Sequence, residues 1–212
     1  EVSGHRRPDG QLCTSNPEVT DLIARRISEF FSANPEVDMV GLWPNDCYGW
    51  CECERCVALE PQRPCALFPP HPARTETYLR FVQAVAEAVA ADHPDRRISA
   101  LAYLNYVEPP PFDLPPNVAV CFAPMHRCFK HPLNAPPECT RNNARYADML
   151  LQWRQRVSGT LYLFCYLMLI DTCSLPYRIT RMLGPYFRWL TEVGCDGYVM
   201  EFKPEEWGPF GV

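Results

Sequence analysis

Residues 39–56 have the sequence MVGLWPNDCYGWCECERC, which joins a short apolar run to a dense group of cysteines. The apolar run predicts a buried strand at about residues 38–43. An acid, Asp46, and an aromatic residue, Trp50, follow this strand directly. Acidic and aromatic side chains just past the carboxyl end of a strand are what an α/β enzyme needs to hold a polar ligand. The stretch therefore predicts an α/β fold with a ligand site at the end of this strand.

The rest of the chain alternates helical and strand-like patterns. Start and stop signals and apolar residues at helical spacing predict helices at about 17–33, 75–93, 142–157 and 177–193, the last with a break at Gly184-Pro185. Apolar runs predict further strands at about 98–104, 118–122, 161–166 and 197–202. Strands that are apolar on both faces and alternate with helices indicate a parallel sheet. Five such strands form an open sheet, or the larger part of a partial or irregular (β/α)8 TIM barrel whose early strands lie upstream.

Length and composition set limits on the partners of the protein. The 212 residues are enough for one large domain, so we expect a single barrel domain with a cysteine-rich loop at 46–74. No run approaches the roughly 20 apolar residues of a membrane span. A formal net charge of −5 gives no reason to expect nucleic acid or an anionic membrane as a partner. The chain begins at Glu1 without an initiator methionine, which suggests a fragment of a longer polypeptide.

Several predicted strands are followed by polar and aromatic side chains that suit a sugar. Glycoside hydrolysis commonly uses two carboxyl groups: one protonates the leaving oxygen, and the other attacks the anomeric carbon or activates water. Asp46 and Glu201 are the candidate pair, because both lie at or beside the ends of predicted strands. The candidate substrate contacts are Trp50, Tyr103, Asn105, His131, Tyr166 and Asp171.

The carboxylates also have ordinary structural interpretations. Asp46 can cap the turn that follows it, and Glu201 can pair with an arginine or lysine inside the barrel. Asp171, the reserve acid, can cap the turn before Cys173. The sequence alone leaves both interpretations open.

Three of the 12 cysteines, Cys51, Cys53 and Cys56, form a C-x-C-x2-C motif. Thiolates at this spacing can converge on a structural zinc ion, which takes four ligands in a closed tetrahedral site, and Cys13 or Cys47 can supply the fourth. We take Cys13 as the fourth ligand. Disulfides are the alternative, since the chain offers many pairings, and free thiols are a third possibility. No organic cofactor is predicted.

The loop after residue 122 carries His126 and His131 on either side of Cys128. A second metal site is possible there. Loop histidines more often act as ordinary hydrogen-bonding residues, and His131 is therefore assigned to the substrate contacts.

Several of these segments together resemble domain-of-unknown-function family 4838, which is found in large exported bacterial proteins. The resemblance is carried by residues 10–19 (GQLCTSNPEV), 44–46 (PND), 50–56 (WCECERC), 101–103 (LAY), 128–133 (CFKHPL) and 197–201 (GYVME). It implies a glycoside-hydrolase-like (β/α)8 barrel, similar to those of α-glucuronidases and β-hexosaminidases, with its early strands before Glu1. It transfers no catalytic role to a particular residue. A proline-rich insert at 61–72 departs from the pattern.

Together these observations predict a carbohydrate-active hydrolase domain that acts on an oligo- or polysaccharide through paired carboxylates. The alternative is a barrel that binds glycans without cleaving them, as a module of a larger surface protein. A third possibility is an incomplete barrel that is inactive without its missing strands. The resemblance implies a secreted, periplasmic or cell-surface location in a bacterium.

Overall fold

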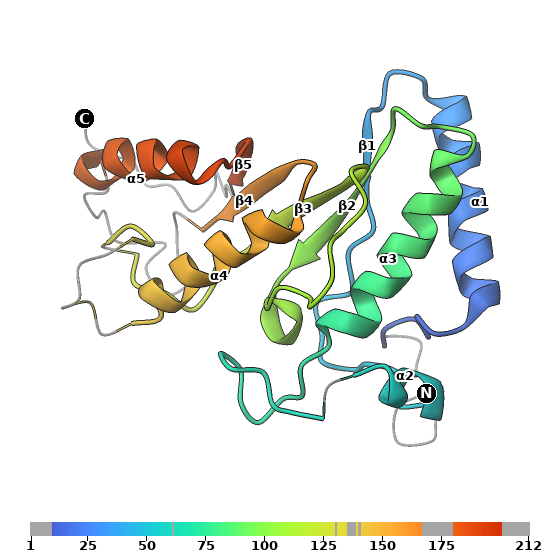
Figure 1. The fold of residues 1–212 in the computed structure, drawn as a ribbon, viewed down its shortest axis with the longest axis horizontal. Coiled ribbons are helices and arrows are strands. Elements are labelled where there is room, and N and C mark those ends of the chain that lie inside the picture. The colour runs from blue at the N-terminus through green and yellow to red at the C-terminus, as the bar shows by residue number, and fades with distance from the viewer. Residues whose placement is uncertain are drawn as a thin grey trace, which may run out of the picture.

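The computed structural model describes residues 10–60, 62–129, 131–134, 139, 141–166 and 180–200 (Figure 1). Five helices, one short 3-10 helix and five strands occur in this part of the chain. In chain order they are α1 (Pro17–Ala33), β1 (Met39–Gly41), α2 (Glu54–Ala58), α3 (Thr75–Ala90), β2 (Arg97–Ala102), η1 (Leu104–Tyr106), β3 (Val118–Phe122), α4 (Asn143–Arg156), β4 (Leu161–Cys165), α5 (Thr180–Val193) and β5 (Gly197–Met200).

The five strands form one sheet in the order β1-β2-β3-β4-β5, and every neighbouring pair is parallel. The predicted parallel sheet is thus confirmed. Sequential parallel strands with helices in the connections are the arrangement of part of a β/α barrel. In this arrangement the loops that follow the strands gather at one edge of the sheet, which we call the carboxyl edge.

The two faces of the sheet differ in what covers them. One face packs against the helices through a continuous apolar core that includes Ile98 and Ala100 of β2 and Val120 of β3, all 0% exposed. The alternating residues point to the opposite face. There Ser99 on β2 and Tyr162 on β4 share a hydrogen bond of 2.6 Å between their hydroxyls, and the Trp43 indole N–H donates to Ser99. We call the first the helix-covered face and the second, whose residues Ala119, Cys121 and Tyr162 are also buried, the opposite face.

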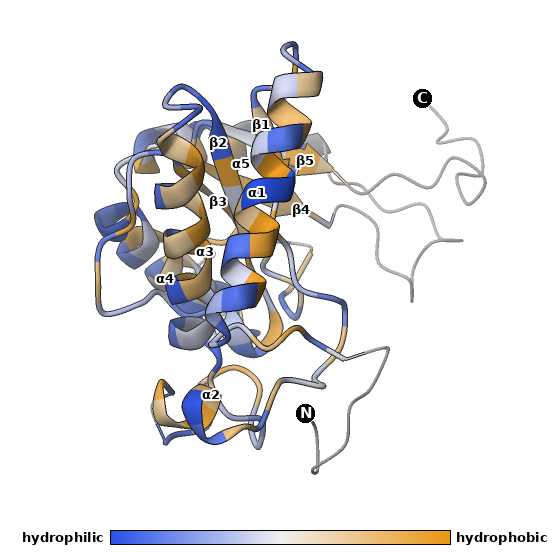
Figure 2. Ribbon diagram, turned by 90° about the vertical axis from the view of Figure 1, so that its right-hand side faces the viewer, coloured by the Kyte–Doolittle hydropathy of each residue, from blue (hydrophilic) through white to orange (hydrophobic). Residues whose placement is uncertain are grey.

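Helix α1 begins and ends where its sequence signals predict. Asn16 accepts a hydrogen bond from the Glu18 backbone N–H, Pro17 takes the first helical position, and Asn34 ends the helix. The colours of α1 in Figure 2 alternate between hydrophobic and hydrophilic, as expected of a helix with one buried face. Phe31 is buried, whereas its neighbour Phe30 is 44% exposed.

Strand β1 is shorter than predicted, and a tyrosine from α3 accounts for this. The Tyr78 hydroxyl donates to the Leu42 carbonyl and accepts from the Leu101 N–H, both at 2.9 Å. The phenol therefore satisfies backbone groups of β1 and β2 that would otherwise bond to each other. As a result the ladder between the two strands ends at Gly41.

Two further expectations about regular structure were wrong. The predicted break at Gly184-Pro185 does not occur, since α5 continues through Pro185. Burial of Tyr186 and Leu190 in the core outweighs the backbone hydrogen bond that proline cannot make. The loop at 46–74 also contains a short helix, α2.

Among the described residues, no helix has the length and apolar character needed to cross a membrane.

Candidate functional site

The loop after β1 places Asp46 in solvent at the carboxyl edge. Two aromatic side chains close to it in sequence are also accessible: Trp43 is 41% exposed and Tyr48 is 42% exposed. The Tyr48 ring stacks on the imidazole of His71, with ring centroids 3.8 Å apart and planes only 6° from parallel. The loop thus presents an exposed carboxylate together with exposed rings.

This loop is held by the side chain of Gln11, which comes from the segment before α1. The Gln11 amide group donates to the carbonyls of Asn45 (2.6 Å) and Cys47 (3.1 Å). Its carbonyl oxygen accepts from the Asn45 backbone N–H at 2.9 Å. The Gln11 backbone N–H donates to the Gly49 carbonyl. Backbone groups on both sides of Asp46 are therefore fixed, which limits the positions that its carboxylate can take.

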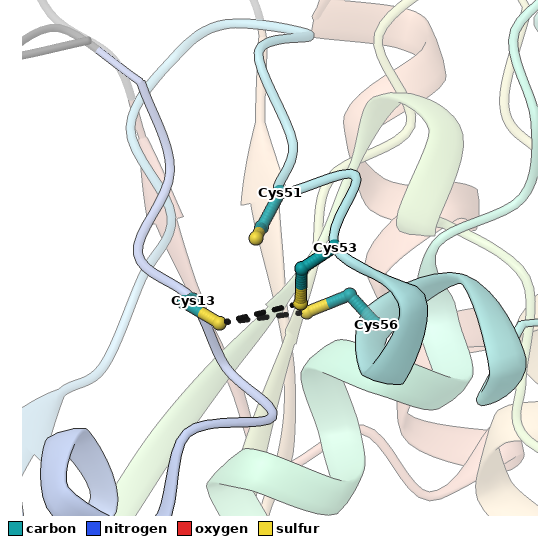
Figure 3. A group of neighbouring side chains, drawn as sticks. All are labelled: Cys13, Cys51, Cys53 and Cys56. Carbon is teal, nitrogen blue, oxygen red and sulfur yellow. Dashed lines mark hydrogen bonds between the residues drawn. The ribbon is translucent and has the colours of Figure 1, made fainter. Parts of the chain in front are cut away.

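The four cysteines predicted as metal ligands come together beside this loop (Figure 3). Cys13 comes from the segment before α1, while Cys51, Cys53 and Cys56 come from the loop and from α2. All four sulfurs lie within 4.8 Å of one another. We call them the four-cysteine cluster. Of the two candidates for the fourth position, Cys13 is the one that joins the group.

The spacing of the sulfurs fits a shared metal ion better than disulfides. Four sulfurs at about 2.3 Å from one ion in a tetrahedron lie about 3.8 Å apart. The Cys13 sulfur is 3.7 Å from that of Cys53 and 3.9 Å from that of Cys56. A disulfide needs about 2.05 Å, and within the described part of the chain no cysteines are joined in this way.

Hydrogen bonds favour the thiolate form of one of these cysteines, Cys53. The Cys56 backbone N–H and the Ser15 hydroxyl lower the pKa of Cys53 to about 6, because both stabilise its thiolate. Burial raises the pKa of Cys56 to about 12. The Ser15 oxygen lies 3.0 Å from the Cys56 sulfur and 3.6 Å from those of Cys13 and Cys53. Ser15 was not predicted from the sequence, although it lies only two residues after Cys13.

The residues predicted to contact a sugar after β2 are buried and hold other segments. Asn105 is 2% exposed; its side-chain N–H donates to the Pro72 carbonyl, and its backbone carbonyl accepts from the Arg74 N–H. Tyr103 is 9% exposed, and its hydroxyl donates to the Met125 sulfur. Both residues lie at the carboxyl edge as expected. Their role as sugar contacts stays a prediction.

Trp50 follows Asp46 in the same loop but lies in the hydrophobic core. It is 5% exposed and packs edge-on against Tyr78 and Tyr106, with centroid distances of 6.2 and 5.3 Å. Its indole N–H is buried and has no hydrogen-bond partner among the described residues. The exposed ring nearest to Asp46 in sequence is that of Tyr48.

The remaining candidates divide between described and undescribed parts of the chain. His131, in the loop after β3, is half-buried, with its Nδ1 atom 3.4 Å from the Cys128 sulfur. Tyr166 directly follows β4 and lies against Phe164, with ring centroids 4.9 Å apart. Glu201 and Asp171 lie outside the described residues. The pairing of Asp46 with Glu201 therefore stays a prediction.

Two sets of contacts near the candidate site were not predicted from the sequence. One is the Gln11 support of the Asp46 loop, and the other is the pair of hydrogen bonds that Ser99 makes with Trp43 and Tyr162 on the opposite face. Both depend on contacts between residues that are far apart in sequence. Short polar contacts of this kind leave no periodic pattern. Only the β-strand alternation of residues 97–102 hinted that Ser99 faces away from the helices.

Comparison with solved structures finds a chain of endo-glycoceramidase II from Rhodococcus sp., captured as a lactosyl-enzyme intermediate, with a TM-score of 0.45 and 15% sequence identity. The alignment covers 92% of this chain and 42% of that one, so the protein spans less than half the length of this neighbour. A likeness at this level carries no conclusion about activity. The comparison with curated proteins gave no match. The family described as domain of unknown function (DUF4838) matches residues 2–207, and the chain therefore belongs to the DUF4838 family.

Proposed function

We propose that this domain is carbohydrate-active and hydrolyses a glycan at the carboxyl edge of its sheet. The observation that supports this most is that the exposed Asp46 lies, along one short loop, between two exposed aromatic residues, Trp43 and Tyr48. Aromatic rings offer flat apolar faces on which the C–H groups of a sugar pack. A carboxyl group beside them can bind a hydroxyl or move a proton.

In this proposal Asp46 is one member of a carboxyl pair and Glu201 is the other. One acid protonates the leaving oxygen of the glycosidic bond. The second carboxylate attacks the anomeric carbon or activates a water molecule. The assignment of Glu201 rests on its place at the end of the last strand pattern in the sequence.

In this proposal the four-cysteine cluster binds a structural zinc ion that stabilises the loop carrying Asp46. Four thiolate donors in a tetrahedral arrangement are characteristic of structural zinc sites, and they leave no open position for a substrate. Cys13 would tie the segment that carries Gln11 to the loop and helix that carry Cys51, Cys53 and Cys56. The ion would thereby hold together the segment before α1 and the end of the loop that carries Asp46.

The catalytic role of Asp46 is tested by measuring the turnover of a panel of glycans by Asp46→Asn, with Asp38→Asn as the control. Asp38 lies at the opposite end of β1, and its side chain is 84% exposed where it pairs with Arg96, so its replacement costs little. We expect Asp46→Asn to lower kcat by about 100-fold or more and Asp38→Asn to leave it unchanged. Unchanged turnover in a folded Asp46→Asn variant would remove Asp46 from the mechanism.

The zinc part is tested by metal analysis of Cys53→Ser and Cys47→Ser. Cys47 is close in sequence but lies outside the four-cysteine cluster. We expect Cys53→Ser to lose one equivalent of zinc and Cys47→Ser to lose none. Equal zinc content in both variants would exclude the cluster as a zinc site.

Glycan binding without cleavage is the second candidate, and the exposure of Trp43 and Tyr48 suits it equally well. It predicts that Trp43→Ala weakens glycan binding while the wild-type chain releases no product from any glycan of the panel. Product release that depends on Asp46 would decide for hydrolysis.

A further inference from the structure

A second group of metal-binding side chains lies in the loop after β3, apart from the four-cysteine cluster. It consists of Cys128, His131 and Cys139, whose ligand atoms all lie within 4.8 Å of one another. All three side chains are half-buried, so they are shielded but not sealed from solvent. We propose that these residues form a second zinc centre with two thiolate ligands and one imidazole ligand, and with its fourth position open to water or to an oxygen of a substrate.

The distance between the first two donors fits a shared ion. In a tetrahedral site with Zn–S of about 2.3 Å and Zn–N of about 2.0–2.1 Å, sulfur and nitrogen lie about 3.6 Å apart. The Cys128 sulfur and the Nδ1 atom of His131 are 3.4 Å apart. Zinc can therefore lie between them with little movement of either side chain.

The loop between these donors is fixed by Asn143, the first residue of α4, which is 0% exposed. Its side-chain oxygen accepts from the Cys128 N–H at 2.6 Å. Its N–H2 group donates to the carbonyls of Cys128 (3.0 Å), His131 (3.2 Å) and Pro132 (2.8 Å). One buried amide thus holds the backbone of both ligands, so the site is shaped before an ion arrives.

A second buried side chain holds the same two carbonyls. Arg127 is 5% exposed, and its guanidinium donates to the carbonyls of Cys128 and His131, each at 3.2 Å. Asn143 and Arg127 together fix the backbone at both Cys128 and His131, which is the support that a preformed metal site needs.

The composition of the donor set favours a metal over the two other uses of such side chains. A nucleophilic thiol paired with a histidine needs only Cys128 and His131, and a disulfide needs only the two cysteines. The approach of all three groups is explained by an ion that binds each of them. Two sulfurs and an imidazole form a donor set suited to zinc.

Among the described residues of this loop the centre has three protein donors, which leaves one position of a tetrahedral zinc site for a further ligand. Structural zinc sites take four protein ligands, whereas sites with three protein ligands hold a water or a substrate in the fourth position. The described part of this loop supplies three donors, and it follows β3 at the carboxyl edge, the side of the sheet that also carries Asp46. A zinc ion there can bind an oxygen ligand and polarise it. His131 would then serve as a metal ligand instead of the sugar contact that the sequence suggested.

The experiment measures zinc in the full chain, purified with reductant and dialysed against zinc. We expect two equivalents in the wild type and one in the double variant Cys128→Ser with Cys139→Ser. His131→Gln, which leaves both thiols in place and guards against misfolding of the double variant, should also retain one. His126→Gln is the matched control, because His126 lies in the same loop outside the group, and it should retain two.

One result would overturn the proposal. In it, the wild type holds a single zinc ion, Cys53→Ser loses this ion, and the double variant keeps it. A Cys128–Cys139 disulfide in the mass spectrum of the unreduced protein would also overturn the proposal. The open position is tested with cobalt in place of zinc, by the difference in visible spectrum between the wild type and the double variant. Thiocyanate should change this difference spectrum, and an unchanged spectrum would show that the fourth position is closed.

Discussion

The helix-covered face of the sheet and the loops at its carboxyl edge are stabilised in different ways. On the face, side chains such as Val82, Val85 and Val120 are completely buried and contribute through apolar contact alone. At the edge, single amides and carboxylates such as Gln11, Asn105 and Glu108 hold loops that are far apart in sequence. The face depends on many interchangeable contacts, whereas the edge depends on a few specific ones. Substitutions should therefore affect global stability most on the face and local order most at the edge.

Trp153→Ala should produce the largest loss of stability. Trp153 lies on the buried side of α4, is 0% exposed, and donates its indole N–H to the Val107 carbonyl at 2.8 Å. We expect the free energy of unfolding to fall by about 3–5 kcal/mol, from lost apolar contact, the cavity and the unpaired carbonyl. Urea denaturation measures this value.

Leu151→Ala on the same helix is the control, because Leu151 is 46% exposed. It should change the unfolding free energy by no more than about 0.5 kcal/mol. Similar losses in the two variants would contradict the idea that α4 contributes through its buried side.

The same difference between face and edge explains what could be predicted from the sequence. Apart from the short helix α2, the order of helices and strands was predicted correctly, because apolar periodicity directly reflects burial against the sheet. The two errors on the face, at β1 and at Pro185, arise where one long-range contact overrides the local pattern. The Tyr78 hydroxyl shortens β1, and burial of Tyr186 carries α5 through its proline.

At the edge, the four cysteines of the cluster could be predicted from the sequence, but the side-chain ties between loops could not. The C-x-C-x2-C spacing indicated Cys51, Cys53 and Cys56, and Cys13 was correctly taken as the fourth member. The roles of Gln11 and Asn143 could not be inferred, since a side-chain amide can bond to any backbone group within reach. The positions of such ties are set by the complete fold.

Glu108→Gln should produce the second largest effect, and this effect should depend on pH. Glu108 is 7% exposed, pairs with Arg63, and accepts from the Ala66 N–H at 2.6 Å. Burial alone would raise the pKa of Glu108, but the hydrogen bonds from Arg63 and Ala66 outweigh it and hold the pKa below its ordinary value. The pair joins the loop after β2 to the proline-rich segment of the long loop at 46–74.

At neutral pH we expect Glu108→Gln to cost about 2 kcal/mol. This is less than for a fully buried pair, because the Arg63 side chain is 51% exposed. A carboxyl group with a lowered folded-state pKa stabilises the fold above its unfolded pKa of about 4.3, and this contribution is lost as the pH falls through the folded value. The difference between variant and wild type should therefore shrink in acid. Urea denaturation at several pH values from neutral to acid measures this difference, with Glu29→Gln, which removes an exposed carboxyl group, as the control for substitution at the surface. A cost that stays constant with pH would argue against an ionised Glu108.

Gln11→Ala should have the smallest effect on global stability and the most localised one. Gln11 is half-buried, and its bonds to Asn45 and Cys47 lie at the surface, so we expect a loss of about 1 kcal/mol. Amide hydrogen exchange should become faster in residues 45–49, while residues in β3 and α4 keep wild-type rates. Leu12→Ala, which replaces an exposed neighbour, should leave both regions unchanged.

The metal content of Gln11→Ala then separates the two supports of the Asp46 loop. Cys13 places the same segment beside the other three cysteines, so this variant should keep the zinc proposed for the cluster while the loop itself opens more often. In that case the amide sets the position of Asp46 and the ion only holds the two segments together, and glycan turnover should fall although the metal is retained. Wild-type exchange in residues 45–49 with zinc still bound would instead mean that the cluster alone orders the loop. The order of the loops at the carboxyl edge would then depend mainly on the four cysteines, and the hydrogen bonds between loops would contribute less.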